Sequence, residues 1–127
     1  MKSSDPKNSS DHNSSDDLSL SILIPVHNEE DNVEILYKEI RSSVDPLNRP
    51  YEIIFIDDGS LDRTLSVLKE IKRKEKFEKN RNFELRIVSF SKNFGQTAAM
   101  QAGFDLAQGD ILVSLDGDLQ NDPRDIP

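Results

Sequence analysis

The fold of this chain is decided by the stretch YEIIFIDDGS at residues 51–60. All of its first six residues except Glu52 are β-branched or aromatic, which is typical of a strand. Two carboxylates and a Gly-Ser pair follow directly, as expected where a strand ends and the chain turns toward a helix. We therefore place Asp57 and Asp58 at the carboxyl end of a strand. Capping the next helix and contributing to a site are equally open roles for Asp58.

Strands and helices alternate on both sides of this stretch. The other apolar runs that predict strands are residues 18–24, 83–90 and 111–115, and we expect the last of these to be buried. Apolar residues at helical spacing predict helices over residues 29–44, 61–77 and 96–107. Short links between these elements predict an α/β fold whose mainly parallel sheet is covered by helices on both faces.

Two residues predict where elements end. Pro25 has no N–H for a ladder hydrogen bond, so we expect it to stop the first strand. Gly109 has the residue type that often ends a helix, and we expect it to stop the third one.

Composition limits the domain organisation and the partners. Residues 1–17 contain Ser, Asp, Asn and Lys but almost no large apolar residue, which predicts a disordered polar tail before a single domain over residues 18–127. The formal net charge of -8 argues against a nucleic-acid partner. No run approaches the roughly 20 apolar residues of a membrane-spanning helix, so we expect this chain itself to be soluble. Residues 122–127 resemble the approach to a further element, and we expect a truncated C-terminus.

Polar residues follow three of the predicted strands, at residues 25–29, 57–60 and 116–118. Ligands of parallel sheets bind beyond the carboxyl ends of the strands, so we expect these segments to converge on one cleft. Asp116 and Asp118, one residue apart, suit a divalent cation with hard oxygen ligands. Gly117 would let the backbone approach a phosphate, and Gln120 could add an amide oxygen. A polar turn is the simpler interpretation of the same residues.

Three further polar residues follow predicted strands. Lys92 and Asn93 follow the third predicted strand, where a cation could meet a phosphate, although a surface lysine is the simpler interpretation. His27 suggests a general base, but its neighbours in the sequence provide no partner for that role.

Four ordered motifs resemble a known family: IPVHNEE at 24–30, DDGSLDRT at 57–64, NFGQ at 93–96 and DGDLQ at 116–120. Over residues 20–127 the chain resembles the N-terminal part of the catalytic domain of family 2 inverting glycosyltransferases. The resemblance is strongest to the polyprenyl-phosphate branch, which includes dolichyl-phosphate mannose synthases and undecaprenyl-phosphate sugar transferases. It implies a three-layer, Rossmann-like GT-A domain, with residues 18–127 as its nucleotide-sugar-binding part.

The resemblance also implies the roles of individual residues. It implies nucleotide contacts by Pro25, His27, Glu29, Ile56, Asp58, Asp116 and Gly117. It implies a metal site of Asp116, Asp118 and Gln120, holding Mg²⁺ or Mn²⁺, with Asp118 as the catalytic residue. Two positions differ from the branch: His27 stands where tyrosine is common, and Gly117 where alanine is common.

The implied reaction moves a sugar from a UDP- or GDP-sugar to a polyprenyl phosphate with inversion. The resemblance implies that the full-length protein works on the cytoplasmic side of a membrane, reached through a missing C-terminal part, and that this chain alone is inactive. Two alternatives are a nucleotide-binding fragment without turnover and a family 2 enzyme with a different acceptor. A phospho-receiver domain is a third, but it needs an acidic pair after the first strand and a phosphorylatable Asp after the third. The chain has Pro25-Val26-His27 and Ser91-Lys92-Asn93 there instead.

Overall fold

The computed structural model describes residues 18–76 and 82–115. In chain order the elements are β2 (Leu20–Val26), α1 (Val33–Val44), the 3₁₀ turn η2 (Asp45–Leu47), β3 (Tyr51–Asp57), α2 (Thr64–Glu75), β4 (Phe83–Ser89), α3 (Gln96–Leu106) and β5 (Ile111–Ser114). The predicted alternation of strands and helices is confirmed.

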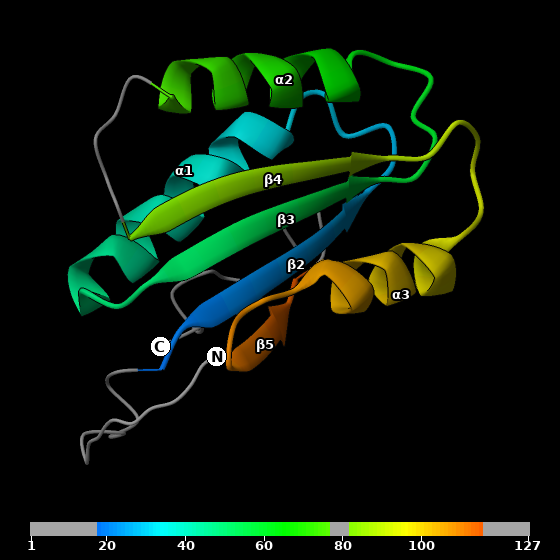
Figure 1. Cartoon of the computed structure of the whole chain (residues 1–127). Helices are drawn as coiled ribbons and strands as arrows, with labels where there is room; N and C mark the ends of the chain where they lie inside the picture. The colour runs from blue at the N-terminus through cyan, green and yellow to red at the C-terminus, as the bar shows by residue number, and fades with distance from the viewer. Residues whose placement is uncertain (1–17, 77–81, 116–127) are drawn as a thin grey trace.

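The strands form one parallel sheet in the order β4-β3-β2-β5. From β2 the chain moves outward to β3 and β4, then crosses back to place β5 on the other side of β2 (Figure 1). This reversal makes the boundary between β2 and β5 a topological switch point, and ligands of such sheets bind beyond the carboxyl ends of the strands near it.

Helices cover both faces of the sheet, giving three layers (Figure 1). On one face, Ile24 and Phe55 pack with Val33 and Ile40 of α1 and Leu68 of α2 in the larger core cluster. The opposite face has a smaller cluster beneath α3, formed by Leu23, Ile54, Ile56 and Ala99. Neighbouring residues of one strand thus enter different cores, because side chains alternate across a strand.

The central and outer strands differ in burial. Every residue of β3 is buried, as expected for a parallel strand with neighbours on both sides and helices on both faces. In β5, residues alternate between half-buried and exposed, and Leu112 is 46% exposed. The expectation that residues 111–115 form a buried strand is therefore only partly correct, since β5 pairs with β2 alone among the described strands.

Pro25 does not stop the first strand. It lies inside β2 and pairs in register with Ile56, and the strand continues to Val26. The Leu23 carbonyl accepts from Leu115 on the β5 side, and the Val26 carbonyl accepts from Asp58 on the β3 side. Because backbone groups alternate in direction along a strand, Pro25 faces the β5 side, so its missing N–H is not needed by the β2–β3 ladder.

The second helix begins at Thr64, three residues later than the pattern predicted. The Asp62 side chain accepts a hydrogen bond from the Thr64 N–H at 2.9 Å, which turns the chain just before the helix. Leu61 stays outside the helix and is 92% exposed. The apolar spacing from Leu61 was therefore misleading at the first turn.

Gly109 does not act as the predicted helix stop, because α3 ends at Leu106 with Ala107 as an extended C-cap. A Cβ at Gly109 would lie 2.6 Å from the Ser21 Oγ and 2.7 Å from the Leu20 carbonyl carbon. Gly109 is therefore required by the close approach of the α3–β5 loop to β2. Within the described ranges, no helix has the length and apolar character needed to cross a bilayer.

Candidate functional site

Three loops meet at the carboxyl edge of the sheet, and we call residues 27–30, 57–64 and 91–95 together the carboxyl-edge loops. They follow β2, β3 and β4, whose ends align because Val26 pairs with Asp57 and Asp57 with Ser89. The expected convergence of residues 25–29 and 57–60 is present, and the loop with Lys92 and Asn93 joins them.

Asp57 closes the turn after β3. It is 2% exposed, and its carboxylate accepts hydrogen bonds from the backbone N–H of Ser60, at 3.2 Å, and from the Ser60 hydroxyl. Neither Asp57 nor Asp58 caps the next helix, because α2 begins at Thr64 with Arg63 as its N-cap.

Asp58 instead holds the loop between β4 and α3. Its Oδ1 accepts from the Phe94 N–H at 2.7 Å, and its Oδ2 accepts from the Gly95 N–H at 2.9 Å. The residue is only 4% exposed, so the charge is stabilised by these two donors at the start of α3. Asp58 thus connects two loops that are distant in sequence, a role that the sequence did not reveal.

Gly59 permits the close contact between the same two loops. Its φ of +67° lies in the left-handed region, and a Cβ there would stand 2.2 Å from the Lys92 carbonyl carbon and 2.4 Å from the Asn93 nitrogen. No side chain fits against backbone at these distances, so the packing of the loops requires glycine.

His27 is exposed and has three polar neighbours. Its Nδ1 lies 2.8 Å from the Asp58 carbonyl oxygen and 3.2 Å from the Asn93 side-chain nitrogen. Its Nε2 lies 3.2 Å from the Asn28 side-chain nitrogen. Sequence analysis could not identify Asp58 and Asn93 as partners of His27, because these two residues come from other loops.

Asn28 joins the first carboxyl-edge loop to the second. Its backbone N–H donates to the Ser60 hydroxyl at 2.8 Å, and its Oδ1 accepts from the Leu61 N–H at 2.8 Å. Its φ of 56° is left-handed, a conformation that asparagine adopts more readily than most residues. Sequence analysis assigned no role to Asn28.

Glu29 and Glu30 are fixed by the start of α2. The Glu29 N–H donates to the buried Thr64 hydroxyl at 2.8 Å, and its carboxylate accepts from Asn32. Asp62 accepts from Thr64 and from the Glu30 N–H, at 3.2 Å for the latter. Desolvation alone raises the pKa of Asp62, but these hydrogen bonds outweigh it and hold the pKa below its ordinary value.

Pro25 and Ile56 are register partners in the pairing of β2 with β3. The Ile56 side chain is fully buried beneath α3 with Leu23, Ile54 and Ala99. It exposes no side-chain surface to a ligand, so the predicted contact to a nucleotide would use its backbone.

The predicted metal site lies outside the described residues. It consists of Asp116, Asp118 and Gln120, and Gly117 is outside them too. In the part of the chain that the structure describes, no group of three His, Cys, Asp or Glu residues gathers in a way that could hold a metal ion.

Lys92 is exposed on the third carboxyl-edge loop. Its Nζ lies 5.2 Å from the centroid of the Phe94 ring, and that ring meets Phe90 edge-on at 5.6 Å between centroids. These contacts support the shape of the loop and leave the two interpretations of Lys92 open.

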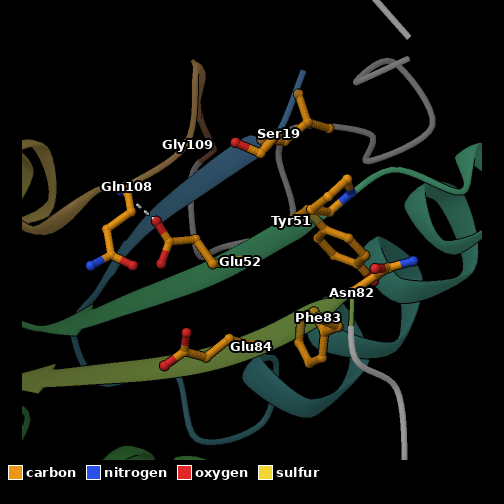
Figure 2. A pocket seen from close by; sticks show the side chains of 10 residues that line it. Ser19, Tyr51, Glu52, Asn82, Phe83, Glu84, Gln108 and Gly109 are labelled. Carbon is orange, nitrogen blue, oxygen red and sulfur yellow. Dashed lines mark hydrogen bonds between the residues drawn. The ribbon is translucent and has the colours of Figure 1, made fainter. Parts of the chain in front are cut away.

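The opposite, amino edge of the sheet has an open cavity of about 520 Å³ (Figure 2). Tyr51, Phe83 and Glu84 line it together with Glu52 and Gln108. Among the described residues predicted for nucleotide binding, which are Pro25, His27, Glu29, Ile56 and Asp58, none lines this cavity. It lies at the edge where the strands of the sheet begin, away from the carboxyl-edge loops (Figures 1 and 2).

Glu52 joins three segments of the chain at the amino edge. It accepts from the Ser21 hydroxyl at 2.6 Å, the Gln108 N–H at 2.7 Å and Arg86 at 3.0 Å. Desolvation by burial would raise the pKa of Glu52, but these three hydrogen bonds and the Arg86 charge outweigh it and lower the pKa. Arg86 also donates to the Leu106 carbonyl at 2.8 Å, which fastens the end of α3.

Comparison with known proteins adds to this geometry. The family model described as "Glycosyl transferase family 2" matches residues 21–127. A dodecaprenyl-phosphate galacturonate synthase from Rhizobium johnstonii is 44% identical over 110 residues, covering 87% of this chain and 31% of the relative. An undecaprenyl-phosphate 4-deoxy-4-formamido-L-arabinose transferase from Edwardsiella ictaluri is 37% identical over 108 residues, covering 85% of this chain and 31% of the relative.

A solved structure with a similar fold is the mannosyltransferase PcManGT from Pyrobaculum calidifontis in complex with GDP-Man and Mn²⁺. It aligns with a TM-score of 0.68 and 21% identity, covering 80% of this chain and 28% of that one. At this identity the likeness supports the fold alone. The chain spans 31% of the length of both curated relatives.

Proposed function

Because the chain belongs to glycosyl transferase family 2, whose model matches residues 21–127, we propose that the protein transfers a sugar from a UDP- or GDP-sugar to a polyprenyl phosphate, with inversion. The observation that carries this proposal is the convergence of the carboxyl-edge loops, with Asp58 bonded to the loop before α3. The same family membership argues against a phospho-receiver domain.

The donor nucleotide is assigned to the carboxyl edge. Pro25, His27 and Glu29 would line the base and ribose, and Ile56 and Asp58 would contact the base. Each oxygen of Asp58 accepts one hydrogen bond from the third loop. A carboxylate oxygen can accept a second hydrogen bond, so the contact of Asp58 to a base would use the 4% of the residue that the loops leave exposed.

Asp116, Gly117 and Asp118 are assigned to the diphosphate, and Asp116, Asp118 and Gln120 to a divalent metal. Two carboxylates and an amide oxygen are hard donors, which suits Mg²⁺ or Mn²⁺. When bound, such an ion supplies Lewis-acid stabilisation of the departing diphosphate. We propose Asp118 as the catalytic residue, because it would hold the metal ion that stabilises the departing diphosphate.

The acceptor class is suggested by the two curated relatives, whose names contain dodecaprenyl phosphate and undecaprenyl phosphate. A phosphate nucleophile is already ionised near neutral pH, so the protein must chiefly position it and neutralise its charge. Because a polyprenyl phosphate is a membrane lipid, we propose that the whole protein works at a membrane, and we assign it to the cytoplasmic side. A different acceptor within the same family is the alternative.

Calorimetric titration with UDP and GDP, with and without Mn²⁺, tests the donor site. We expect one nucleotide to bind, and to bind more tightly with the metal. Binding of neither nucleotide, in this chain and in the whole protein, would contradict the proposal. Incubating the whole protein with the matching nucleotide sugar and undecaprenyl phosphate or glycerol phosphate then separates the two acceptor classes.

The variant Asp116→Ala tests the metal assignment. Losing a carboxylate ligand should weaken metal-dependent nucleotide binding by about tenfold or more. The matched control is Asp105→Ala, which removes the same charge from an exposed position on α3, where the Asp105 carboxylate accepts a hydrogen bond from the Gln101 side chain at 2.9 Å. Equal binding by both variants would overturn the assignment.

A further inference from the structure

Among the carboxyl-edge loops, Asn28 contacts His27 in a way that determines where the imidazole carries its proton. The Asn28 Oδ1 lies 2.8 Å from the Leu61 backbone nitrogen, and its Nδ2 lies 3.2 Å from the His27 Nε2. A backbone N–H can only donate, so the amide oxygen must face Leu61 and the NH₂ group must face the ring. The Nε2 atom therefore accepts and carries no proton.

The other ring nitrogen leads independently to the same tautomer. The His27 Nδ1 lies 2.8 Å from the Asp58 carbonyl oxygen, which can only accept. Nδ1 must therefore carry the proton. The Asn93 side-chain nitrogen lies 3.2 Å from Nδ1 and 3.4 Å from the Asp58 carbonyl oxygen. Because the protonated Nδ1 cannot accept, the Asn93 amide donates to the carbonyl. Both nitrogens thus specify a neutral ring protonated on Nδ1.

The charged groups on the surrounding loops have partners of their own. On the first loop, the Glu29 carboxylate accepts from Asn32, and Glu30 accepts from the Arg63 N–H at 2.9 Å. On the second loop, Asp57 is bonded to Ser60, Asp58 to Phe94 and Gly95, and Asp62 to Thr64. On the third loop, the Lys92 ammonium lies over the Phe94 ring. None of these contacts is made to the His27 ring nitrogens, so the proton position follows from Asn28 and the Asp58 carbonyl.

We propose that Asn28 is a positioning residue that acts through His27: it fixes the tautomer protonated on Nδ1 and so withdraws both ring nitrogens from the bound nucleotide. The inference rests on the proposed function for its ligand. It implies that His27 offers a base only its ring face and carbon edge. Hydrogen-bond discrimination between uracil and guanine must then come from other groups.

The variant Asn28→Asp tests the proton position with almost no change of shape. Aspartate also tolerates the left-handed φ of 56°, and one of its oxygens can still accept from Leu61. Its other oxygen cannot donate, so Nε2 must gain a proton, giving an imidazolium that still donates from Nδ1 to the Asp58 carbonyl.

Imidazole ¹⁵N spectra provide the measurement, at about pH 7.5, where an ordinary histidine is neutral. The chain has two histidines, so His12→Gln leaves His27 as the single imidazole. In that background we expect an unprotonated Nε2 with Asn28 and a protonated Nε2 with Asp at this position. The matched control is Asn48→Asp, because Asn48 has a φ of 55° and is exposed next to η2. It should leave the ring unchanged.

Spectra without nucleotide decide the proposal. A protonated Nε2 in the wild-type ring, or a ring that is the same in Asn28→Asp and in the wild type, would overturn it. Adding UDP or GDP with Mg²⁺ to the whole protein should leave both ring nitrogens in their original state, and a nucleotide-induced change at either one would also overturn it. Failure of both nucleotides to bind would contradict the proposed function and not the tautomer, so the two failures are distinguishable.

Discussion

The two edges of the same sheet are held together differently. At the amino edge, side chains bond to one another and to strand and helix ends, as in the Glu52, Ser21 and Arg86 cluster. At the carboxyl edge, side chains such as Asp58 and Asn28 accept hydrogen bonds from the backbone of other loops. The first arrangement fixes strands relative to each other, and the second fixes the shape of loops. At the carboxyl edge, the form of the surface therefore depends on contacts between several loops at once.

The largest expected effect comes from the loop contact at Gly59. In Gly59→Ala the new Cβ would meet Lys92 backbone 2.2 Å away, at a φ of +67°. We expect the free energy of unfolding to fall by about 4 kcal/mol, because backbone must move and the conformation is strained. Urea denaturation monitored by circular dichroism measures the change.

Gly95→Ala is the matched control for that experiment. Gly95 has a φ of +103°, but a Cβ there would have no atom within 4 Å. This variant contains the strain without the collision and should lose about 1 to 2 kcal/mol. Equal losses in the two variants would show that the contact between the second and third loops does not hold this edge together.

The second largest expected loss of stability comes from a substitution at the amino edge. Glu52→Gln removes a charge that is 6% exposed and leaves Arg86 without its ion pair, so we expect a loss of about 2 to 3 kcal/mol at pH 7. Glu84→Gln is the control, because Glu84 pairs with Glu52 in the β3–β4 register but is exposed. It should change stability by less than about 0.5 kcal/mol.

The stability difference between the wild type and Glu52→Gln should also depend on pH. The folded pKa of Glu52 is lowered, so its carboxylate stabilises the fold above the unfolded pKa of about 4.3. That contribution is lost as the pH falls through the lower folded pKa. Denaturation curves should therefore converge below about pH 4. A constant difference across this range would mean that the charge is not what holds the amino edge.

The smallest expected loss of stability comes from a substitution at the carboxyl edge. Thr64→Val keeps the shape of a fully buried side chain but removes the acceptor for the Glu29 N–H and the donor to Asp62. We expect a loss of about 1 to 2 kcal/mol, and faster amide hydrogen exchange at Glu29. Thr97→Val is the control, since Thr97 is exposed in the first turn of α3. Unchanged, slow amide exchange at Glu29 in Thr64→Val would show that the Thr64 hydroxyl does not hold the Glu29 N–H.

Local periodicity was enough to predict the fold. The apolar residues at helical spacing in the first predicted helix are the buried residues of α1, namely Val33, Leu36, Tyr37, Ile40 and Val44, whereas Ile35 lies off that face and is exposed. Strand runs and short links then restricted the sheet to a parallel arrangement. Such patterns are readable because each element must turn its apolar side chains toward a core.

The details of the site could not be predicted in the same way. Pro25 and Gly109 were misinterpreted because their constraints come from neighbouring strands and not from adjacent residues. The partner of Asp58 is backbone of the third loop, and a backbone N–H has no signature in the sequence. Asn28 was overlooked because its importance lies in bonds to Leu61 and His27 that appear only after folding.

The hydrogen bonds around Asp58 also have a consequence for the order of folding. Asp58 is 31 residues from His27 and 36 residues from Phe94 in the sequence. The His27 and Asn93 side chains, which meet beside it, are 66 residues apart. Such long closures follow the pairing of β2, β3 and β4, because the chain entropy they require is recovered only once the strands are in place. We therefore expect the carboxyl edge to be completed after the sheet, so that the nucleotide site proposed there forms only once the strands have paired. A ligand that binds there selects the fully assembled chain and draws the folding equilibrium toward it.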